Sequence, residues 1–209
     1  MGKSNKLLAK INPFKYQTSK HIRNETPKKY SNYRRYKPVL KKEFYGRCIY
    51  CRKPTLPTDD PSSFHVEHYR PKSKFPNLEC EYTNLYYSCA ACNRNKGTYL
   101  SDTLRVVNPC DYIMSRHLKF KNEEVLTCSK LGEITEKILQ LNSTISVSYR
   151  EYIEIAIRSL VSELIDPPKR MSRVDKLAYA ETVKRSLCTM GIITGHSAGE
   201  LKNILKIKI

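Results

Sequence analysis

No stretch of the sequence is apolar over the roughly 18 residues that a membrane-spanning helix needs, and no apolar signal segment precedes its cysteines. These absences predict a protein without a membrane span that stays in the cytoplasm, where disulfides are rare. Acidic residues are also scarce, because 20 Asp and Glu stand against 38 Lys and Arg, a net charge of +18. This imbalance exceeds what solubility needs and indicates a polyanionic partner, with nucleic acid as the first candidate.

The positive charge is concentrated at the start of the chain. Residues 1–47 hold 14 basic and 2 acidic side chains, which gives +12 of the total +18. Residues 1–45 alternate Lys and Arg with Tyr, a composition that resists a packed core, and we predict a basic arm. Two interpretations stay open. The arm lies along a phosphate backbone with Tyr30, Tyr33 and Tyr36 stacking on bases, or it is a solvated tail.

The rest of the chain divides into two parts of different character. Residues 46–110 combine prolines with short apolar runs, which predicts short strands and loops pinned by something other than a large hydrophobic core. A short helix near residues 39–45 is expected to lead into this part. Residues 111–209 show apolar residues at helical spacing, and Ser197 with Glu200 forms a capping box. This last part is predicted to be helical.

Four of the eight cysteines form two C-x-x-C pairs. Cys48 and Cys51 make the first pair, and Cys89 and Cys92 make the second after 37 intervening residues. Two such pairs supply four thiolates to a tetrahedral zinc ion, which stabilises a small fold that lacks enough core of its own. The alternative is two pairs of unrelated buried thiols, which is weaker because paired C-x-x-C motifs rarely arise otherwise. We therefore predict a structural zinc site.

Residues suited to hydrolytic chemistry lie between and beside these pairs: Glu67 and His68 in VEHYRPKS, Asn84 in NLYYSC and Asn93 in CNRNKG. Pro71 cannot join a central strand ladder, so the strand is expected to end near Glu67 and His68, which lets both turn toward one site. Singly, three of these residues have ordinary explanations: Glu67 as a surface carboxylate, Asn84 as a turn residue and Asn93 as a helix cap. Their joint occurrence favours a catalytic centre.

This arrangement resembles the HNH endonuclease superfamily from the first cysteine pair to Gly97. The resemblance implies an α+β fold with a zinc-stapled ββα-metal (HNH) core over residues 46–110. A basic N-terminal arm over residues 1–45 would precede this core, and an α-helical C-terminal region over residues 111–209 would follow it. The activity that the resemblance implies is metal-dependent hydrolysis of phosphodiester bonds in nucleic acid.

The same resemblance assigns roles to the four residues. Glu67 and Asn93 would bind a divalent cation, and their oxygen ligands favour Mg²⁺ or Mn²⁺. His68 would be the general base, and Asn84 would help to orient it. Asn95 is an alternative to Asn93 as the ligand, and position 67 holds Glu where Asp is commoner in this family.

Basic residues flank the expected site and are predicted to bind nucleic acid through its phosphates: Arg70, Lys72, Arg94 and Lys96. A solvated basic loop is the alternative for such residues. His65 lies three residues before the expected base, where either substrate binding or a structural role is open. Neither the choice between DNA and RNA nor the strandedness of the substrate follows from these residues.

A narrower resemblance extends over residues 46–165, through EHYRPKS, NLYYSCAACNRNKG, VVNPCD and HLKF. These segments are similar to the HNH proteins of bacterial Septu and retron antiphage defence systems. That resemblance implies a defence nuclease with a partner ATPase of the SMC/RecF-like class. The competing hypotheses are an HNH nuclease that acts alone and a non-catalytic zinc module that binds nucleic acid or serves as a scaffold.

Overall fold

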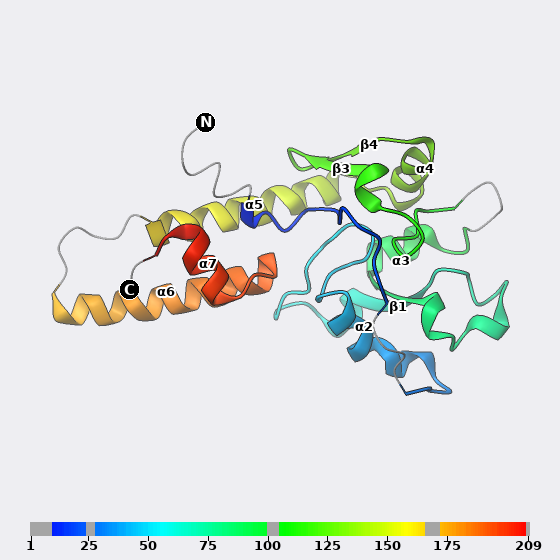
Figure 1. The fold of residues 1–209 in the computed structure, drawn as a ribbon, viewed down its shortest axis with the longest axis horizontal. Coiled ribbons are helices and arrows are strands. Elements are labelled where there is room, and N and C mark those ends of the chain that lie inside the picture. Colours follow the sequence, from blue (N-terminus) through cyan, green and yellow to red (C-terminus); the bar gives the residue numbers. More distant parts are fainter. Residues whose placement is uncertain (1–9, 24–27, 100–104, 166–171, 208–209) are drawn as a thin grey trace. The chain divides into compact units, whose positions relative to one another are not determined.

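A computed structural model describes residues 10–23, 28–99, 105–165 and 172–207. Contacts divide the chain into two compact units, which are described separately. The larger unit is Phe14–Ser148, and the helical unit joins Met1–Pro13 to Tyr149–Ile209. Figure 1 shows the elements of both units. The three segments expected from the sequence, residues 1–45, 46–110 and 111–209, stay a prediction.

A ββα unit lies at the centre of the larger unit (Figure 1). Strand β1 (Phe64–His68) pairs antiparallel with β2 (Leu85–Cys89), and helix α3 (Ala90–Lys96) follows β2 directly. All five residues of β2 are buried, and its aromatic residues are types that favour strands. Strand β1 ends at His68, as expected from the proline that follows. The α+β class and the ββα core predicted from the sequence are therefore confirmed.

Helix α3 has well-defined ends. The Cys89 sulfur accepts a hydrogen bond from the Cys92 backbone N–H, so it caps the first turn of the helix. Gly97 follows the last turn with φ of +50°, a conformation that favours glycine. The helix start is therefore tied to the second cysteine pair.

Part of the predicted basic arm packs into the larger unit. After η1 (Tyr33–Tyr36), a short helix α2 (Lys37–Glu43) forms close to the position expected from the sequence. Tyr36 and Leu40 are buried in the same core as β1 and β2. Tyr16, further upstream, is buried there as well. The described part of the arm from residue 14 onward is therefore not a free tail.

A buried carboxylate fixes this N-terminal segment to the core. Glu43 pairs with Arg23 at 2.6 Å and with the His21 ring at 3.2 Å, and Tyr82 donates a hydrogen bond to it. Arg23 also donates to the backbone oxygens of Tyr82 and Leu85, at 2.9 and 3.0 Å. Arg23 is thus bonded directly to the residues around the start of β2.

The larger unit also contains a β-hairpin that the sequence reading did not predict. Strands β3 (Leu118–Lys121) and β4 (Glu124–Thr127) pair antiparallel, with Asn122 at φ of +43° in the turn. Helix α4 (Lys130–Leu139) follows, and Ser129 caps it. Residues 111–209 are therefore not uniformly helical, because short strands precede the first long helix.

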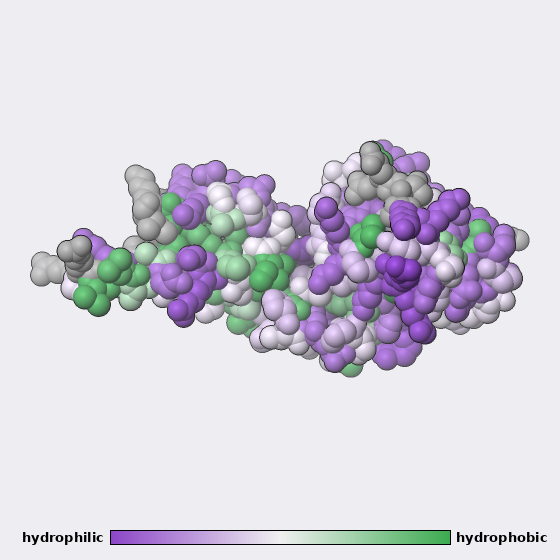
Figure 2. All heavy atoms as spheres, turned by 90° about the horizontal axis from the view of Figure 1, so that it is seen from below, coloured by the Kyte–Doolittle hydropathy of each residue, from purple (hydrophilic) through white to green (hydrophobic). Residues whose placement is uncertain are grey.

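The helical unit is built from α6 (Arg173–Thr194), α7 (Ala198–Leu205) and most of α5 (Thr144–Ile165). The expected Ser197–Glu200 capping box is present at the start of α7. Buried residues recur at helical spacing on α5, namely Ile153, Ile157, Val161 and Leu164. Figure 2 shows apolar residues at the surface of this unit as well. Nowhere in the described part of the chain is a helix long and apolar enough to cross a membrane.

The carboxylate of Glu43 allows the docking of the N-terminal segment to be tested. Burial alone would raise the pKa of Glu43, but hydrogen bonds from His21 and Tyr82 and the charge of Arg23 outweigh burial and lower this pKa below its ordinary value of 4.5. A carboxyl group with a lowered pKa stabilises the fold above its unfolded pKa. This contribution is lost as the pH falls through the folded pKa.

We expect Glu43→Gln to lower the free energy of unfolding by about 3–5 kcal/mol at pH 7, because the substitution removes one partner of a buried ion pair. The deficit relative to wild type should shrink as the pH falls below 4.5. Urea unfolding at several pH values measures both effects. The matched control is Glu133→Gln, which breaks an exposed pair with Lys130 and should cost about 1 kcal/mol or less. Equal losses in the two variants would contradict the structural role of Glu43.

Candidate active site and metal centre

The four paired cysteines converge on one point. Their sulfur atoms all lie within 4.8 Å of one another, and three of the four residues are buried. The Cys51 and Cys89 sulfurs are 3.7 Å apart. A tetrahedral zinc ion with Zn–S bonds of about 2.3 Å places its sulfurs about 3.8 Å apart. The cluster therefore fits the structural zinc site predicted from the sequence.

The thiols of this cluster also shift one another's pKa values. Burial would raise the pKa of Cys48, but hydrogen bonds from Cys51, Cys89 and Cys92 lower this pKa well below its ordinary value. Hydrogen bonding to Cys48 in turn raises the pKa of Cys92. Zinc binds cysteine as thiolate, so a bound ion would require these thiols to lose their protons.

His68 lies at the end of β1, where its ring is half-buried. Its Nε2 atom lies 2.9 Å from the backbone oxygen of Glu79. A carbonyl oxygen only accepts hydrogen bonds, so Nε2 carries the proton and Nδ1 keeps its lone pair in the neutral ring. Burial lowers the pKa of His68, partly opposed by this hydrogen bond. The ring is therefore held in a tautomer suited to a general base.

Asn84 positions the chain beyond His68 rather than the ring itself. Its side chain accepts a hydrogen bond from the Arg70 N–H at 2.8 Å and donates to the Arg70 oxygen at 3.0 Å. It also donates to the Leu78 oxygen at 3.2 Å. Asn84 thus joins the residues after β1 to the segment that carries Glu79. The expected orienting role would then be exerted on His68 through the backbone.

The Glu67 side chain has partners different from those of the His68 ring. Its Oε1 pairs with the Lys96 Nζ at 2.6 Å, and its Oε2 accepts a hydrogen bond from the Tyr50 hydroxyl at 2.8 Å. Burial together with the Glu67 charge raises the pKa of Tyr50, which keeps that hydroxyl protonated. This geometry differs from the expectation that Glu67 and His68 turn toward one site. Because β1 continues through His68, successive side chains still alternate.

Lys96 is not placed where a phosphate contact was expected. Its side chain is 1 % exposed, and its Nζ also donates to the His68 backbone oxygen at 2.9 Å. The ammonium therefore links α3 to the end of β1 instead of facing solvent. The sequence did not predict this pairing, because it joins residues 29 positions apart whose contact depends on the fold.

The predicted catalytic cation has no free ligand at Glu67. Both carboxylate oxygens are engaged, and the side chain is 2 % exposed. Asn93 is half-buried, one helical turn before Lys96. Asn95 donates to the Leu139 backbone oxygen at 3.0 Å, so it is used in packing α3 against α4. In this arrangement Glu67 and Asn93 do not fit a bound Mg²⁺ or Mn²⁺, because the Lys96 ammonium holds the carboxylate.

The remaining predicted phosphate contacts are on the surface. Arg70, Lys72 and Arg94 are exposed. Lys72 pairs with Glu79 at 2.8 Å, and the Arg70 guanidinium lies 5.5 Å from the Phe75 ring centroid. Arg70 and Lys72 follow His68 closely in the chain, so they bring positive charge to its side of the ββα unit. His65 shares a strand face with Glu67.

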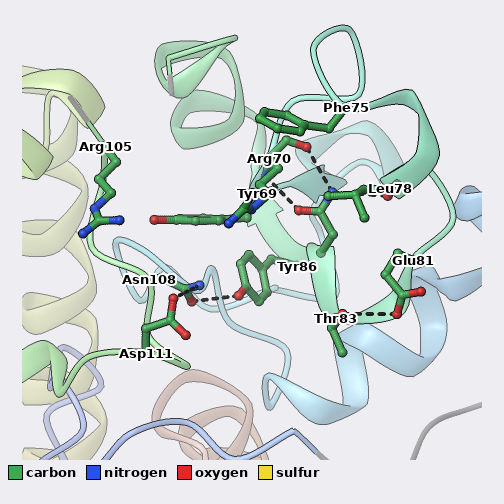
Figure 3. A pocket seen from close by; sticks show the side chains of 11 residues that line it. Tyr69, Arg70, Phe75, Leu78, Glu81, Thr83, Tyr86, Arg105, Asn108 and Asp111 are labelled. Carbon is green, nitrogen blue, oxygen red and sulfur yellow. Dashed lines mark hydrogen bonds between the residues drawn. The ribbon is translucent and has the colours of Figure 1, made fainter. Parts of the chain in front are cut away.

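A polar pocket opens beside Arg70 and Asn84 (Figure 3). Its volume is about 290 Å³, and arginines and acids both line it, including Arg105 and Asp111. The Tyr69 hydroxyl donates to the Val106 backbone oxygen at 2.9 Å. The pocket therefore adjoins the segment that Asn84 holds in place.

Metal analysis tests the cysteine cluster. We expect one zinc ion per wild-type chain, and we expect Cys92→Ser to lose that zinc and to lower the melting temperature sharply, because the fold depends on the ion. The control is Cys188→Ser, since Cys188 is exposed and lies outside the cluster. Elemental analysis with thermal unfolding measures both. Full zinc content in Cys92→Ser would contradict the site.

Replacing Lys96 with Met tests the catalytic cation separately. The Glu67 carboxylate would then be buried without its counter-ion, so the free energy of unfolding should fall by about 3–5 kcal/mol. If Glu67 and Asn93 can hold Mg²⁺ or Mn²⁺, the ion will raise the melting temperature of this variant and leave wild type unchanged. A second variant that also carries Glu67→Gln should not respond. If the cation changes the melting temperature of neither wild type, nor Lys96→Met, nor the double variant, a cation site at Glu67 is contradicted.

Comparison with known proteins agrees with this geometry. Residues 48–98 match the model of the family described as HNH endonuclease. The chain is 35 % identical over 98 residues to the Septu protein PtuB of Bacillus thuringiensis, covering 46 % of this chain and 37 % of that protein. It is 29 % identical over 139 residues to the Septu protein PtuB of Bacillus mycoides (strain KBAB4), covering 51 % of this chain and 46 % of that protein.

The chain thus spans less than half the length of these curated relatives. No solved structure gives a significant match to it. The matched residues run from the first cysteine pair to the end of α3, which are the residues that build the ββα unit and the four-cysteine cluster. The chain therefore contains an HNH endonuclease domain and is homologous to Septu protein PtuB.

Proposed function

We propose that the chain is an endonuclease that hydrolyses phosphodiester bonds in nucleic acid, with His68 as its general base. The observation that carries this proposal is the hydrogen bond between Nε2 of His68 and the Glu79 oxygen. It leaves the Nδ1 lone pair of a half-buried, neutral ring available to a water molecule. The HNH domain around this histidine supports the same assignment.

In the proposed reaction, a water oxygen attacks phosphorus while the His68 Nδ1 takes a proton from that water. The bond between phosphorus and the leaving oxygen breaks, and the leaving oxygen is protonated from solvent. Arg70 and Lys72 bind phosphate oxygens next to the reacting group and position the strand. Asn84 keeps the backbone at Arg70 in place through its paired hydrogen bonds.

The need for Mg²⁺ or Mn²⁺ stays a prediction from the family resemblance. The buried Glu67–Lys96 pair opposes it, and no part of the proposed proton transfer uses a metal ion. The same pair supports a second candidate function, a non-catalytic zinc module that binds nucleic acid or serves as a scaffold. In that case the positive charge would provide binding, and no bond would be cleaved.

The biological role proposed here is that of an effector in a bacterial antiphage defence system. Similarity to the two Septu proteins supports this role. We extend the proposal to a partner ATPase of the SMC/RecF-like class, with the α5–α7 helices as part of the docking surface. Both relatives are Septu proteins, so the resemblance to retron proteins stays a prediction.

Cleavage assays test the proposed base. Purified protein is incubated with plasmid, single-stranded DNA and total tRNA, in buffers with Mg²⁺, with Mn²⁺ or with EDTA. We expect cleavage of at least one substrate, and we expect His68→Ala to slow it by about 100-fold or more, because general-base catalysis contributes about 10²–10⁴.

His117→Ala is the matched control, because His117 is a half-buried histidine in the same unit that hydrogen-bonds Ser129. It should cleave at the wild-type rate. Zinc content and affinity for nucleic acid should be unchanged in His68→Ala. Wild-type cleavage by His68→Ala would contradict the assignment of the base, and binding without any cleavage by wild type would favour the zinc module.

A further inference from the structure

The turn that begins helix α2 lies against the candidate general base. Tyr33, the first residue of η1, packs edge-on to the His68 ring, with ring centroids 4.7 Å apart and an interplanar angle of 68°. Tyr33 stays partly exposed beside the half-buried His68. An aromatic ring from the N-terminal segment therefore forms one wall of the candidate active site.

This turn is anchored firmly. Tyr36 is 2 % exposed and packs on Tyr82, with ring centroids 5.4 Å apart. Its hydroxyl accepts a hydrogen bond from the Tyr30 backbone N–H at 3.0 Å. The side chain of Asn32 caps the turn by accepting from the Arg34 N–H. The residues between these anchors are therefore held in fixed positions before any ligand arrives.

Positive charge surrounds the Tyr33 ring. The Lys72 ammonium, which also pairs with Glu79, lies 4.8 Å from its centroid, and the Arg34 guanidinium lies 5.8 Å from it. Arg35 lies 4.7 Å from the Tyr30 ring. Arg34 and Arg35 are exposed, and no described carboxylate pairs with either of them. An aromatic platform with unneutralised guanidinium groups beside it matches the chemistry of a nucleotide, which offers a flat base and an anionic phosphate.

We propose that Tyr33, Arg34, Arg35 and Lys72 form a nucleotide subsite beside His68 that holds an unpaired nucleotide next to the scissile phosphate. Tyr33 stacks on the base and positions the strand, while the arginines and Lys72 bind the flanking phosphates. A base inside a duplex has both faces covered by its neighbours, so only an unpaired base can stack on a tyrosine. The subsite therefore selects single-stranded or locally opened nucleic acid. This inference rests on the proposed function, because the subsite is defined by its place beside the base.

Binding of phosphorothioate oligonucleotides, which resist hydrolysis, tests the subsite independently of cleavage. Fluorescence anisotropy is measured for a labelled single strand and for its duplex. Tyr33→Ala should weaken single-strand binding about 10-fold, from the loss of one base stack, and change duplex binding less than about 2-fold. Tyr33→Phe keeps the ring and should bind like wild type.

The arginines are tested by the salt dependence of the same binding. The double variant Arg34→Gln with Arg35→Gln should make the negative slope of log affinity against log salt shallower by about 1.4. Each phosphate contact on a single strand contributes about 0.7 to the size of this slope. Lys119→Gln with Lys121→Gln removes the same charge from the exposed β3 strand and is the matched control. It should leave the slope nearly unchanged.

In the cleavage assay, Tyr33→Ala should raise KM for a single strand more than it lowers kcat, and Tyr33→Phe should restore both.

Unchanged single-strand affinity in Tyr33→Ala, or equal slope losses in the arginine and lysine pairs, would overturn the subsite. If wild type shows the predicted binding pattern and no cleavage, the proposed hydrolysis fails while the subsite stands. If wild type cleaves and the binding pattern is missing, the subsite alone fails.

Discussion

The convergence of four cysteine sulfurs on one point is the constraint on which the HNH domain depends. One cysteine pair follows helix α2, and the other spans the junction of β2 with α3. The cluster therefore brings together the two ends of the chain segment that contains β1. A two-stranded sheet with one short helix buries too little surface to be stable by itself. Coordination of a metal ion by the four cysteines would supply the stability that this small unit lacks. The Cys89 sulfur adds to this by capping α3, so one side chain serves both the cluster and the helix.

Around this fixed point, the candidate base is held mainly by backbone groups. The Glu79 oxygen selects the tautomer of His68, and Asn84 ties the chain after β1 to the segment that supplies that oxygen. Backbone partners are little affected by substitution of their own side chains, so the geometry at His68 depends on the fold of a short loop. The neighbouring Glu67–Lys96 pair is a different kind of element. Two buried charges cost considerable desolvation, which their attraction and the Tyr50 hydrogen bond offset.

The sequence allowed the local features to be predicted. The cysteine pairs, the end of β1 before Pro71, the helix near residue 40 and the capping box at Ser197 all depend on residues close together in the chain. The α+β class followed from the same short-range patterns together with the family resemblance. The β3–β4 hairpin was missed because its strands have only four residues each, although Asn122 is a common turn residue.

Contacts between distant residues were beyond such patterns. Nothing near Lys96 shows that its ammonium is buried against Glu67, and nothing in the basic arm shows that Tyr33 reaches His68. The net charge of a segment indicates that it can bind polyanions, but it does not indicate whether the segment packs into the core. For this reason the arm was expected outside the core, while Tyr16, Tyr36 and His21 lie inside it.

The docking of Arg23 has a consequence for how the chain folds during synthesis. Its guanidinium bonds to the Leu85 oxygen across 62 residues, so this partner is made much later than Arg23 itself. At about 5–20 residues per second, the interval before Leu85 is made lasts about 3–12 s. During that time the tyrosine-rich basic segment has no core to join. The bond from Arg23 to β2 therefore forms only after Leu85, the first residue of that strand, has been made.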